Sequence, residues 1–386
     1  MKDQLEISLQ LKYRKDLVEK LVTSGYAFAV WRMPETDQIR FIISLRNPVQ
    51  TRKNLSELSK GFVLNLYNDN HPISPLYIPA DIELIDDEVR IDPRISSSVV
   101  EPFLNKLSNS RKRTNKHSGL ILENTRNSYE SKVRQAVDHI RDGWFEKVVL
   151  SRFEDIELND DFSPWAFFER ICKAYPNAFC SISHLPGKGV WIGASPELLI
   201  ADDNNRFQTI ALAGTKLLEK NRKLKEMAWT HKEIEEQALV SRHIVNCFKK
   251  IRLREFHEYG PKTINFGLLA HLKTEFEVDY HEVRFDHLAD QMLELLHPTS
   301  AVCGMPVKNA KSWINDVEEY DREFYAGFLG PVDYHESTDL FVNLRCIKVQ
   351  NNTARVYAGA GITEESIPQK ELKETEMKIQ AMKQFL

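Results

Sequence analysis

The clearest pattern of apolar and polar positions lies near the C-terminal end of the sequence. Residues 355–357 suit a strand, and Gly359 and Gly361 follow, where the missing Cβ allows a sharp turn or close contact with a ligand. From Ser366 on, apolar residues recur every three or four positions, which predicts a helix with one buried face. That face comprises Leu372, Thr375, Ile379, Met382 and Leu386.

Glutamates three residues apart stand on two of the predicted helices. Glu371 and Glu374 lie beside the buried face of the last helix, and Glu233 and Glu236 share a face of an earlier one. Two such helices can converge on a hard divalent cation, because carboxylate oxygens are the ligands that Mg²⁺ prefers. The alternative is a solvated face with a Glu374–Lys378 pair, which supports a helix by only about 0.3–0.5 kcal/mol.

Two charged residues stand at the start of apolar, strand-like runs. Lys147 precedes Val-Val-Leu, and Glu197 precedes Leu-Leu-Ile. Burial lowers the pKa of a lysine and raises the pKa of a glutamate, so these groups can serve as a base and an acid. The alternatives are a surface lysine that extends its amine to water, and a turn carboxylate bonded to nearby amides. Local sequence leaves both interpretations open.

Further polar residues stand among small or apolar ones. Gly214 permits close approach of a ligand, and the hydroxyl of Thr215 can bind a carboxylate. Arg345, flanked by apolar residues of a predicted strand, has the rigid fork that carboxylates fit. For His297 and Tyr325, local sequence favours a structural hydrogen bond.

The beginning of the sequence is less informative. It alternates predicted strands, such as 27–32 and 39–45, with turn-rich pieces, and no group of reactive residues stands out. Residues 105–119 are polar and basic, which predicts an exposed connection. A nucleic-acid patch is disfavoured there because no aromatic residues are interleaved.

Composition limits the partners and the compartment. The 386 residues carry a net charge of −4 with acids and bases well mixed, which favours a small-molecule partner over nucleic acid or anionic lipid. The first residues lack the apolar run of a secretory signal, and no stretch is long enough to cross a membrane. Five cysteines without C-x-x-C spacing indicate reduced thiols in a cytoplasmic protein rather than a zinc site or disulfides.

From about Ser128 to the C-terminus, several strings occur in the order found in the chorismate-utilising enzymes. The chain therefore resembles that family, and within it the isochorismate synthases. The strings are Lys147-Val-Val-Leu-Ser-Arg, Gly193-Ala-Ser-Pro-Glu, Ala213-Gly-Thr, Lys232-Glu-Ile-Glu-Glu, His297-Pro-Thr-Ser-Ala-Val-Cys-Gly, Phe324-Tyr-Ala-Gly, and Ala358-Gly-Ala-Gly-Ile with Glu371-x-x-Glu374-Thr-Glu-x-Lys378.

The resemblance implies an α+β fold, in which large, mostly antiparallel sheets pack as a sandwich with helices on the outside. It implies a single structural unit over residues 1–386, with a variable N-terminal part, 1–125, and a chorismate-binding catalytic core, 126–386. It also implies a monomer.

The implied reaction is the Mg²⁺-dependent conversion of chorismate to isochorismate. Lys147 would take a proton from the water that attacks C2, and Glu197 would protonate the C4 hydroxyl as it leaves. Glu236 and Glu374 would bind Mg²⁺ directly, with Glu233 and Glu371 holding them or bridging through water.

The resemblance also assigns substrate contacts. The metal ion would bind the ring carboxylate. The residues at the ring carboxylate would be Gly214, Thr215 and Lys378. Those at the enolpyruvyl carboxylate would be Tyr325, Arg345 and Gly359, and His297 would contact the ring.

Three positions separate relatives within the family. Ala213 stands where aminodeoxychorismate synthases have a nucleophilic lysine, Lys147 is absent from anthranilate synthases, and Ala301 stands where salicylate synthases commonly have threonine. These residues indicate a reaction that stops at isochorismate, for menaquinone or siderophore synthesis. The alternatives are a salicylate synthase, which would release pyruvate, and a non-catalytic binding relative, which would need neither the acid nor the base.

Overall fold

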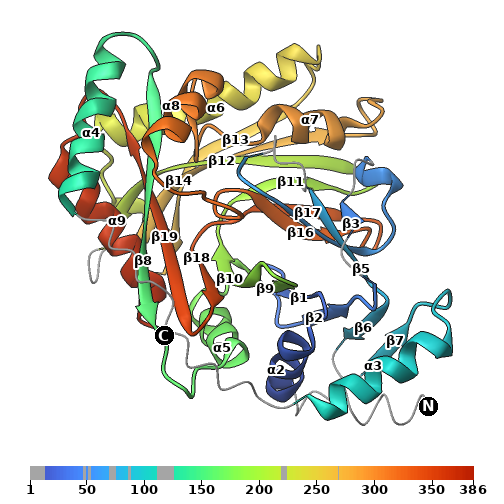
Figure 1. Cartoon of the computed structure of the whole chain (residues 1–386). Helices are drawn as coiled ribbons and strands as arrows, with labels where there is room; N and C mark the ends of the chain where they lie inside the picture. Colours follow the sequence, from blue (N-terminus) through green and yellow to red (C-terminus); the bar gives the residue numbers. More distant parts are fainter. Residues whose placement is uncertain are drawn as a thin grey trace.

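Two large antiparallel sheets, packed face to face and surrounded by helices, form the chain (Figure 1). The structure is a computed structural model, and it describes residues 14–46, 49–50, 54–68, 75–85, 88–110, 126–218, 224–267 and 269–386. The predicted α+β sandwich with outer helices is confirmed. In these residues, no helix is long and apolar enough to span a membrane.

The first sheet has ten strands within the described residues, in the order β15-β8-β19-β18-β10-β9-β1-β2-β6-β7. Strands from the beginning of the sequence therefore extend a sheet that later residues form. The bounds are β1 Phe28–Arg32, β2 Ile39–Ile43, β6 Ile82–Ile85, β7 Glu88–Ile91, β8 Lys147–Glu157, β9 Phe179–Leu185, β10 Gly189–Ser195, β15 Gly304–Met305, β18 Cys346–Gln350 and β19 Thr353–Ile362.

The second sheet has nine strands in the same described part of the chain, in the order β13-β14-β12-β11-β17-β16-β4-β5-β3. Here too, early strands pair with late ones, since β4 lies beside β16. The bounds are β3 Val49–Gln50, β4 Gly61–Asn65, β5 Leu76–Pro79, β11 Leu198–Asp202, β12 Arg206–Leu217, β13 His257–Phe266, β14 Leu269–Asp279, β16 Phe328–Val332 and β17 Thr338–Val342.

Helices cover the sheets, and two of them correct the sequence analysis. Helices α2 and α3 lie where only strands and turns were predicted, and α3 includes the start of the predicted connection 105–119. Residues 111–119 of that connection lie outside the described residues. The bounds are α2 Arg14–Ser24, α3 Ser97–Asn109, α4 Arg126–Arg141, α5 Pro164–Ala174, α6 His231–Lys250, α7 Leu288–Leu296, α8 Val307–Val317 and α9 Pro368–Lys383, with short 3-10 helices η2 Leu55–Glu57 and η3 Leu224–Glu226.

The central strands of the first sheet are buried on both faces. In β1, Phe28 and Val30 pack among the outer helices, whereas Ala29 and Trp31 pack in the core between the two sheets. A strand covered on both sides has a continuous apolar sequence instead of an alternating one. The apolar run after Lys147 in β8 has the same cause, and it places this lysine inside the molecule.

Strand β19 differs from the prediction at its glycines. It continues through both of them to Ile362, with Gly359 opposite Ser151 and Gly361 opposite Val149 of β8, so the predicted turn is wrong. At Gly361 the missing Cβ makes room for a protein side chain, because an added Cβ would overlap Oε1 of Glu236. The glycine leaves the room that this carboxylate occupies.

Helix α9 begins one residue later than predicted. Ile367 is its N-cap, and Pro368 is in its first turn, where proline is tolerated. The Ser366 hydroxyl instead accepts a hydrogen bond from the backbone N–H of Thr363. The predicted apolar face is confirmed for Leu372, Thr375, Ile379 and Met382, which are all buried, whereas Leu386 lies beyond the end of the helix and is half-buried.

Candidate active site

A cavity lies between the two sheets, where the start of β8 and the end of β19 face the end of β12 and the start of β14. Helices α6 and α9 each contribute a carboxylate to it. Lys147, Glu233, His297 and Glu371 are not part of its lining. The predicted residues that line it are Glu197, Gly214, Thr215, Glu236, Ala301, Tyr325, Arg345, Gly359, Glu374 and Lys378.

A larger cavity of about 730 Å³ lies elsewhere, beside the turns at Asp202–Asn204 and 283–290. Acidic side chains outnumber basic ones in its lining, and none of the predicted site residues reaches it. A cavity with this charge disfavours an anionic ligand. We therefore take the smaller cavity, which has both basic and acidic groups, as the candidate active site.

Lys147, the first residue of β8, lies directly behind the cavity wall and is fully buried. Its Nζ forms an ion pair with Glu236, 2.9 Å from Oε1. Gly361 packs against the pair, since a Cβ there would lie 3.1 Å from Cε of Lys147. The predicted burial is confirmed, and the alternative of a surface lysine is wrong.

Glu197 precedes β11 and is only 3% exposed. Burial raises the pKa of this carboxyl to about 7, although the Thr299 hydroxyl, Lys147 and Lys378 each act in the opposite direction. Thr299 Oγ1 donates a hydrogen bond to Oε1 of Glu197 over 3.3 Å. A glutamic acid with this pKa holds its proton near neutral pH and can deliver it.

Arg345 lies between β17 and β18, not inside a strand as predicted, and its φ of +47° is in the left-handed region. The side chain is buried, and burial lowers the pKa of the guanidinium. Nη1 has no hydrogen-bond partner among the described residues. A buried guanidinium with a free donor can bind a carboxylate from a ligand.

His271 of β14 is a cavity residue that the sequence analysis missed. Its Nδ1–H donates to the carbonyl of Gly214 over 2.9 Å, and its Nε2 lies 3.4 Å from Nη2 of Arg345. Burial lowers the pKa of His271 to about 3, so the ring is neutral. His271, Lys273 and Glu275 occupy every second position of the strand and therefore share one side of it. A side with such polar residues predicts exposure to solvent rather than a site.

Tyr325, Gly359 and Lys378 form one part of the wall. The ring of Tyr325 stacks on Tyr357 with centroids 5.0 Å apart, and a Cβ at Gly359 would lie 3.1 Å from the Tyr325 hydroxyl. Lys378 Nζ donates to the carbonyl of Gly359 over 2.8 Å and lies 2.7 Å from Oε1 of Glu374. Hydroxyl and ammonium donors thus gather at the end of β19.

Two of the four predicted metal ligands face the cavity, namely Glu236 and Glu374. Glu371 instead pairs with Lys232 at 2.5 Å, and Glu233 forms a capping box with Thr230 at the start of α6. Among the described residues, no three His, Cys, Asp or Glu side chains gather as a metal site.

Lysines offset the negative charge of these carboxylates. Burial acts to raise the pKa of Glu236, but Lys147, Lys232 and Lys378 outweigh it, so the pKa is lowered and the group is ionised. Two carboxylates at one cavity suit a cation such as Mg²⁺, which takes its other ligands from water and substrate. The donors present therefore fit the predicted metal.

His297 does not reach the cavity. Its Nε2–H donates to the carbonyl of Leu66 over 3.0 Å, and its ring packs edge-on against Phe328 at 5.0 Å between centroids. This agrees with the structural hydrogen bond that its local sequence favours, and it does not support the ring contact that the resemblance implies.

The chain is similar to known proteins over most of its length. Residues 85–386 match the family described as chorismate binding enzyme. Isochorismate synthase EntC of Escherichia coli is 30% identical over 311 residues, which cover 76% of this chain and 78% of that protein. The vibriobactin-specific isochorismate synthase of Vibrio cholerae is 29% identical over 270 residues, covering 68% and 67%.

A solved structure extends the likeness to the N-terminal strands. MenF, the menaquinone-specific isochorismate synthase of Escherichia coli, aligns with a TM-score of 0.78 and 20% identity. The alignment covers 96% of this chain and 91% of that one, so the two share a fold.

Proposed function

The chain belongs to the chorismate binding enzyme family, and we propose that it acts as an isochorismate synthase. The observation that carries this proposal is the pair of buried groups beside one cavity, the amine of Lys147 and the carboxyl of Glu197. A protein that only bound chorismate would need neither a base nor a protonated acid.

The reaction exchanges one hydroxyl for another through an allylic shift. Water attacks C2 of the ring while Lys147 Nζ, in its amine form, accepts a proton from it. The two ring double bonds shift toward C4, and the C4 hydroxyl leaves as water with the proton held by Glu197. One water enters and one leaves, and the two side chains end with one proton moved from acid to base.

The cationic and hydroxyl groups of the cavity would bind the two carboxylates of chorismate. The free Nη1 of Arg345, the hydroxyl of Tyr325 and the backbone at Gly359 suit the enolpyruvyl carboxylate. Gly214, Thr215 and Lys378 suit the ring carboxylate. His271 would orient Arg345, because its neutral Nε2 faces the guanidinium.

Glu236 and Glu374 would hold Mg²⁺, while Glu233 and Glu371 position the two helices. Bound there, Mg²⁺ would supply positive charge to the ring carboxylate. The capping box of Glu233 fixes the first turn of α6, and the Glu371–Lys232 pair ties α9 to α6.

The test is to incubate the protein with chorismate and Mg²⁺ and to follow the products by proton NMR, with and without a chelator. We expect isochorismate in equilibrium with chorismate, dependent on Mg²⁺ and without pyruvate. Salicylate plus pyruvate would identify a salicylate synthase. Binding of chorismate without turnover would contradict the proposed chemistry.

A further inference from the structure

The carboxyl of Glu197 has one side-chain hydrogen-bond partner in the described chain, the hydroxyl of Thr299. The backbone of Glu197 is fixed separately. Its N–H donates to Ser195 Oγ over 3.2 Å, and its carbonyl accepts from the N–H of Val342 over 3.0 Å. These backbone hydrogen bonds fix the position of the residue. Among the described residues, the side-chain hydrogen bond that orients its carboxyl comes from Thr299.

The segment that carries Thr299 is itself fastened. The carbonyl of Thr299 accepts from the N–H groups of Val302 and Cys303, over 3.1 and 2.9 Å. The carbonyl of Val302 accepts from Nη1 of Arg322 over 2.9 Å, and Nη2 of Arg322 donates to the carbonyl of Val149 over 2.8 Å. One guanidinium therefore connects this segment to β8, two residues beyond Lys147.

Arg322 cannot turn to other partners. Its Nε and Nη2 donate to the two oxygens of Glu318 over 2.7 and 2.6 Å, and both side chains are buried. Oε1 of Glu318 also accepts from the N–H and hydroxyl of Ser151 over 2.7 and 2.9 Å. A buried bidentate pair whose remaining groups are also bonded is held in one geometry.

We propose that Thr299 is a positioning residue, which orients the Glu197 carboxyl so that it can deliver its proton into the cavity. This inference rests on the proposed function. The charged groups that face Glu197 are Lys147 from β8 and Lys378 from α9, whereas Ser195 and Val342 contribute no titratable group. Thr299 is thus the uncharged contact that can be removed without changing the net charge of the site.

A hydroxyl that donates to a carboxylate stabilises the charged form, so its loss must raise the pKa of Glu197. For Thr299→Val we expect an increase of roughly 0.5–1 pH unit, the equivalent of one lost hydrogen bond. Thr299→Ser keeps the hydroxyl and should keep the native pKa. Ser300→Ala is the matched control, because this buried neighbouring hydroxyl has no hydrogen-bond partner among the described residues.

The measurement is carbon-13 NMR of the protein labelled at glutamate Cδ, titrated with pH, with Glu197→Gln used to assign the signal. The basic limb of kcat/KM against pH, with chorismate and Mg²⁺, should move upward by the same amount in Thr299→Val. An unchanged Glu197 titration in a folded Thr299→Val protein would overturn the inference. If Thr299→Val does not fold, Thr299→Ala provides the same comparison.

The two proposals fail in different ways. If the native protein does not convert chorismate but Thr299→Val still shifts the Glu197 titration, the proposed function is wrong. The effect of Thr299 on Glu197 would stand in that case. Native turnover with a basic limb that does not respond to Thr299→Val would disprove the positioning role alone.

Discussion

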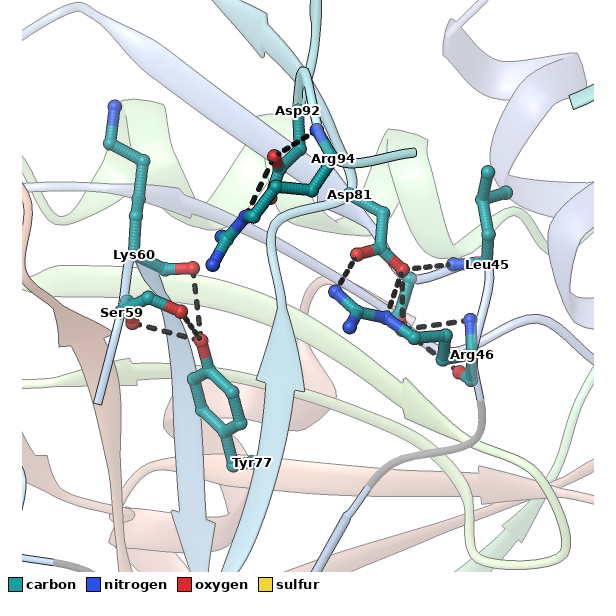
Figure 2. A network of polar contacts seen from close by, with 9 residues as sticks. Leu45, Arg46, Ser59, Lys60, Tyr77, Asp81, Asp92 and Arg94 are labelled. Atoms are coloured by element: carbon teal, nitrogen blue, oxygen red, sulfur yellow. Dashed lines mark hydrogen bonds and ion pairs between the residues drawn. The ribbon is translucent and has the colours of Figure 1, made fainter. Parts of the chain in front are cut away.

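Asp81, near the N-terminal strands, and Arg345, at the cavity, are both buried, but their surroundings differ. The Asp81 carboxylate accepts from the guanidinium of Arg46 and from the N–H of Leu45 over 2.8 Å, and Figure 2 shows all three facing one another. In the same network, the hydroxyl of Tyr77 donates to the carbonyl of Ser59 over 2.8 Å. In the region around Asp81, the polar groups of the protein therefore bond to one another.

Arg345 shows the opposite arrangement. Its nearest polar side chain is the neutral ring of His271, and its Nη1 has no partner in the described chain. Burial of an uncompensated charge is costly, so a folded protein keeps one where something outside the chain will offset it. The difference between these regions separates charges that stabilise the fold from charges that await a ligand.

The strongest test of this distinction removes the amine of Lys147, which is paired with Glu236 but lies beside the cavity and has a proposed chemical role there. Lys147→Met retains an apolar stem in a buried position, so we expect a folded protein whose kcat falls by about 10²–10⁴-fold, as for a lost general base. Initial rates and circular dichroism would be measured together. Lys348→Met, which breaks a pair with Glu323 outside the cavity, is the control and should keep native turnover. Native turnover of Lys147→Met would exclude it as the base.

Arg345→Met should separate binding from stability. Loss of a charged hydrogen bond to the substrate should raise KM for chorismate by roughly 10- to 100-fold. The free energy of unfolding should stay the same or rise by about 1 kcal/mol, because an uncompensated buried charge is removed. Steady-state kinetics and urea unfolding measure the two effects. A clear loss of stability with native KM would contradict the assignment of Arg345 to a ligand.

Asp81→Asn should give the reverse result. The amide cannot replace a carboxylate that accepts several hydrogen bonds, so the free energy of unfolding should fall by about 1–3 kcal/mol. The protein that remains folded should keep native kcat and KM, since Asp81 is remote from the cavity lining. Reduced kcat with unchanged urea unfolding would place Asp81 among the functional charges.

The smallest effect concerns pH. Because the pKa of Glu197 is about 7, kcat/KM should decline as pH rises above 7 and the acid loses its proton. Between the ordinary glutamate pKa and 7, the native state holds a proton that the unfolded state has released, so stability falls as pH rises through that window. Urea unfolding at several pH values should show this slope in native protein and a shallower slope in Glu197→Gln, because Asp202, whose pKa is raised to about 6, still contributes.

Local signals in the sequence predicted several elements well. Ser163 stands just before Pro164 and caps α5, and Thr230 and Glu233 form the capping box that begins α6. The apolar run behind Lys147 correctly predicted its burial. These features depend on neighbouring residues, which is why a linear pattern reveals them.

Features that depend on distant residues were missed. His271 belongs to the polar alternation of β14, and its contacts with Gly214 and Arg345 come from residues far away in the sequence. Lys232 pairs with Glu371, which follows much later in the chain. Sequence spacing shows which residues share a helix face, but not which residues that face will contact. The predicted cluster of four glutamates therefore appears in the structure as glutamate–lysine pairs, and only Glu236 and Glu374 line the cavity.

The pairing of early strands with late ones has a consequence for how the chain assembles during synthesis. Leu64 of β4 pairs with Leu329 of β16, and Val30 of β1 pairs with Ile182 of β9. The first strands to leave the ribosome therefore wait for their partners, and long-range pairing of this kind makes folding slow. Glu374 and Lys378 come later still, on α9, so the active site is among the last parts of the molecule to be completed.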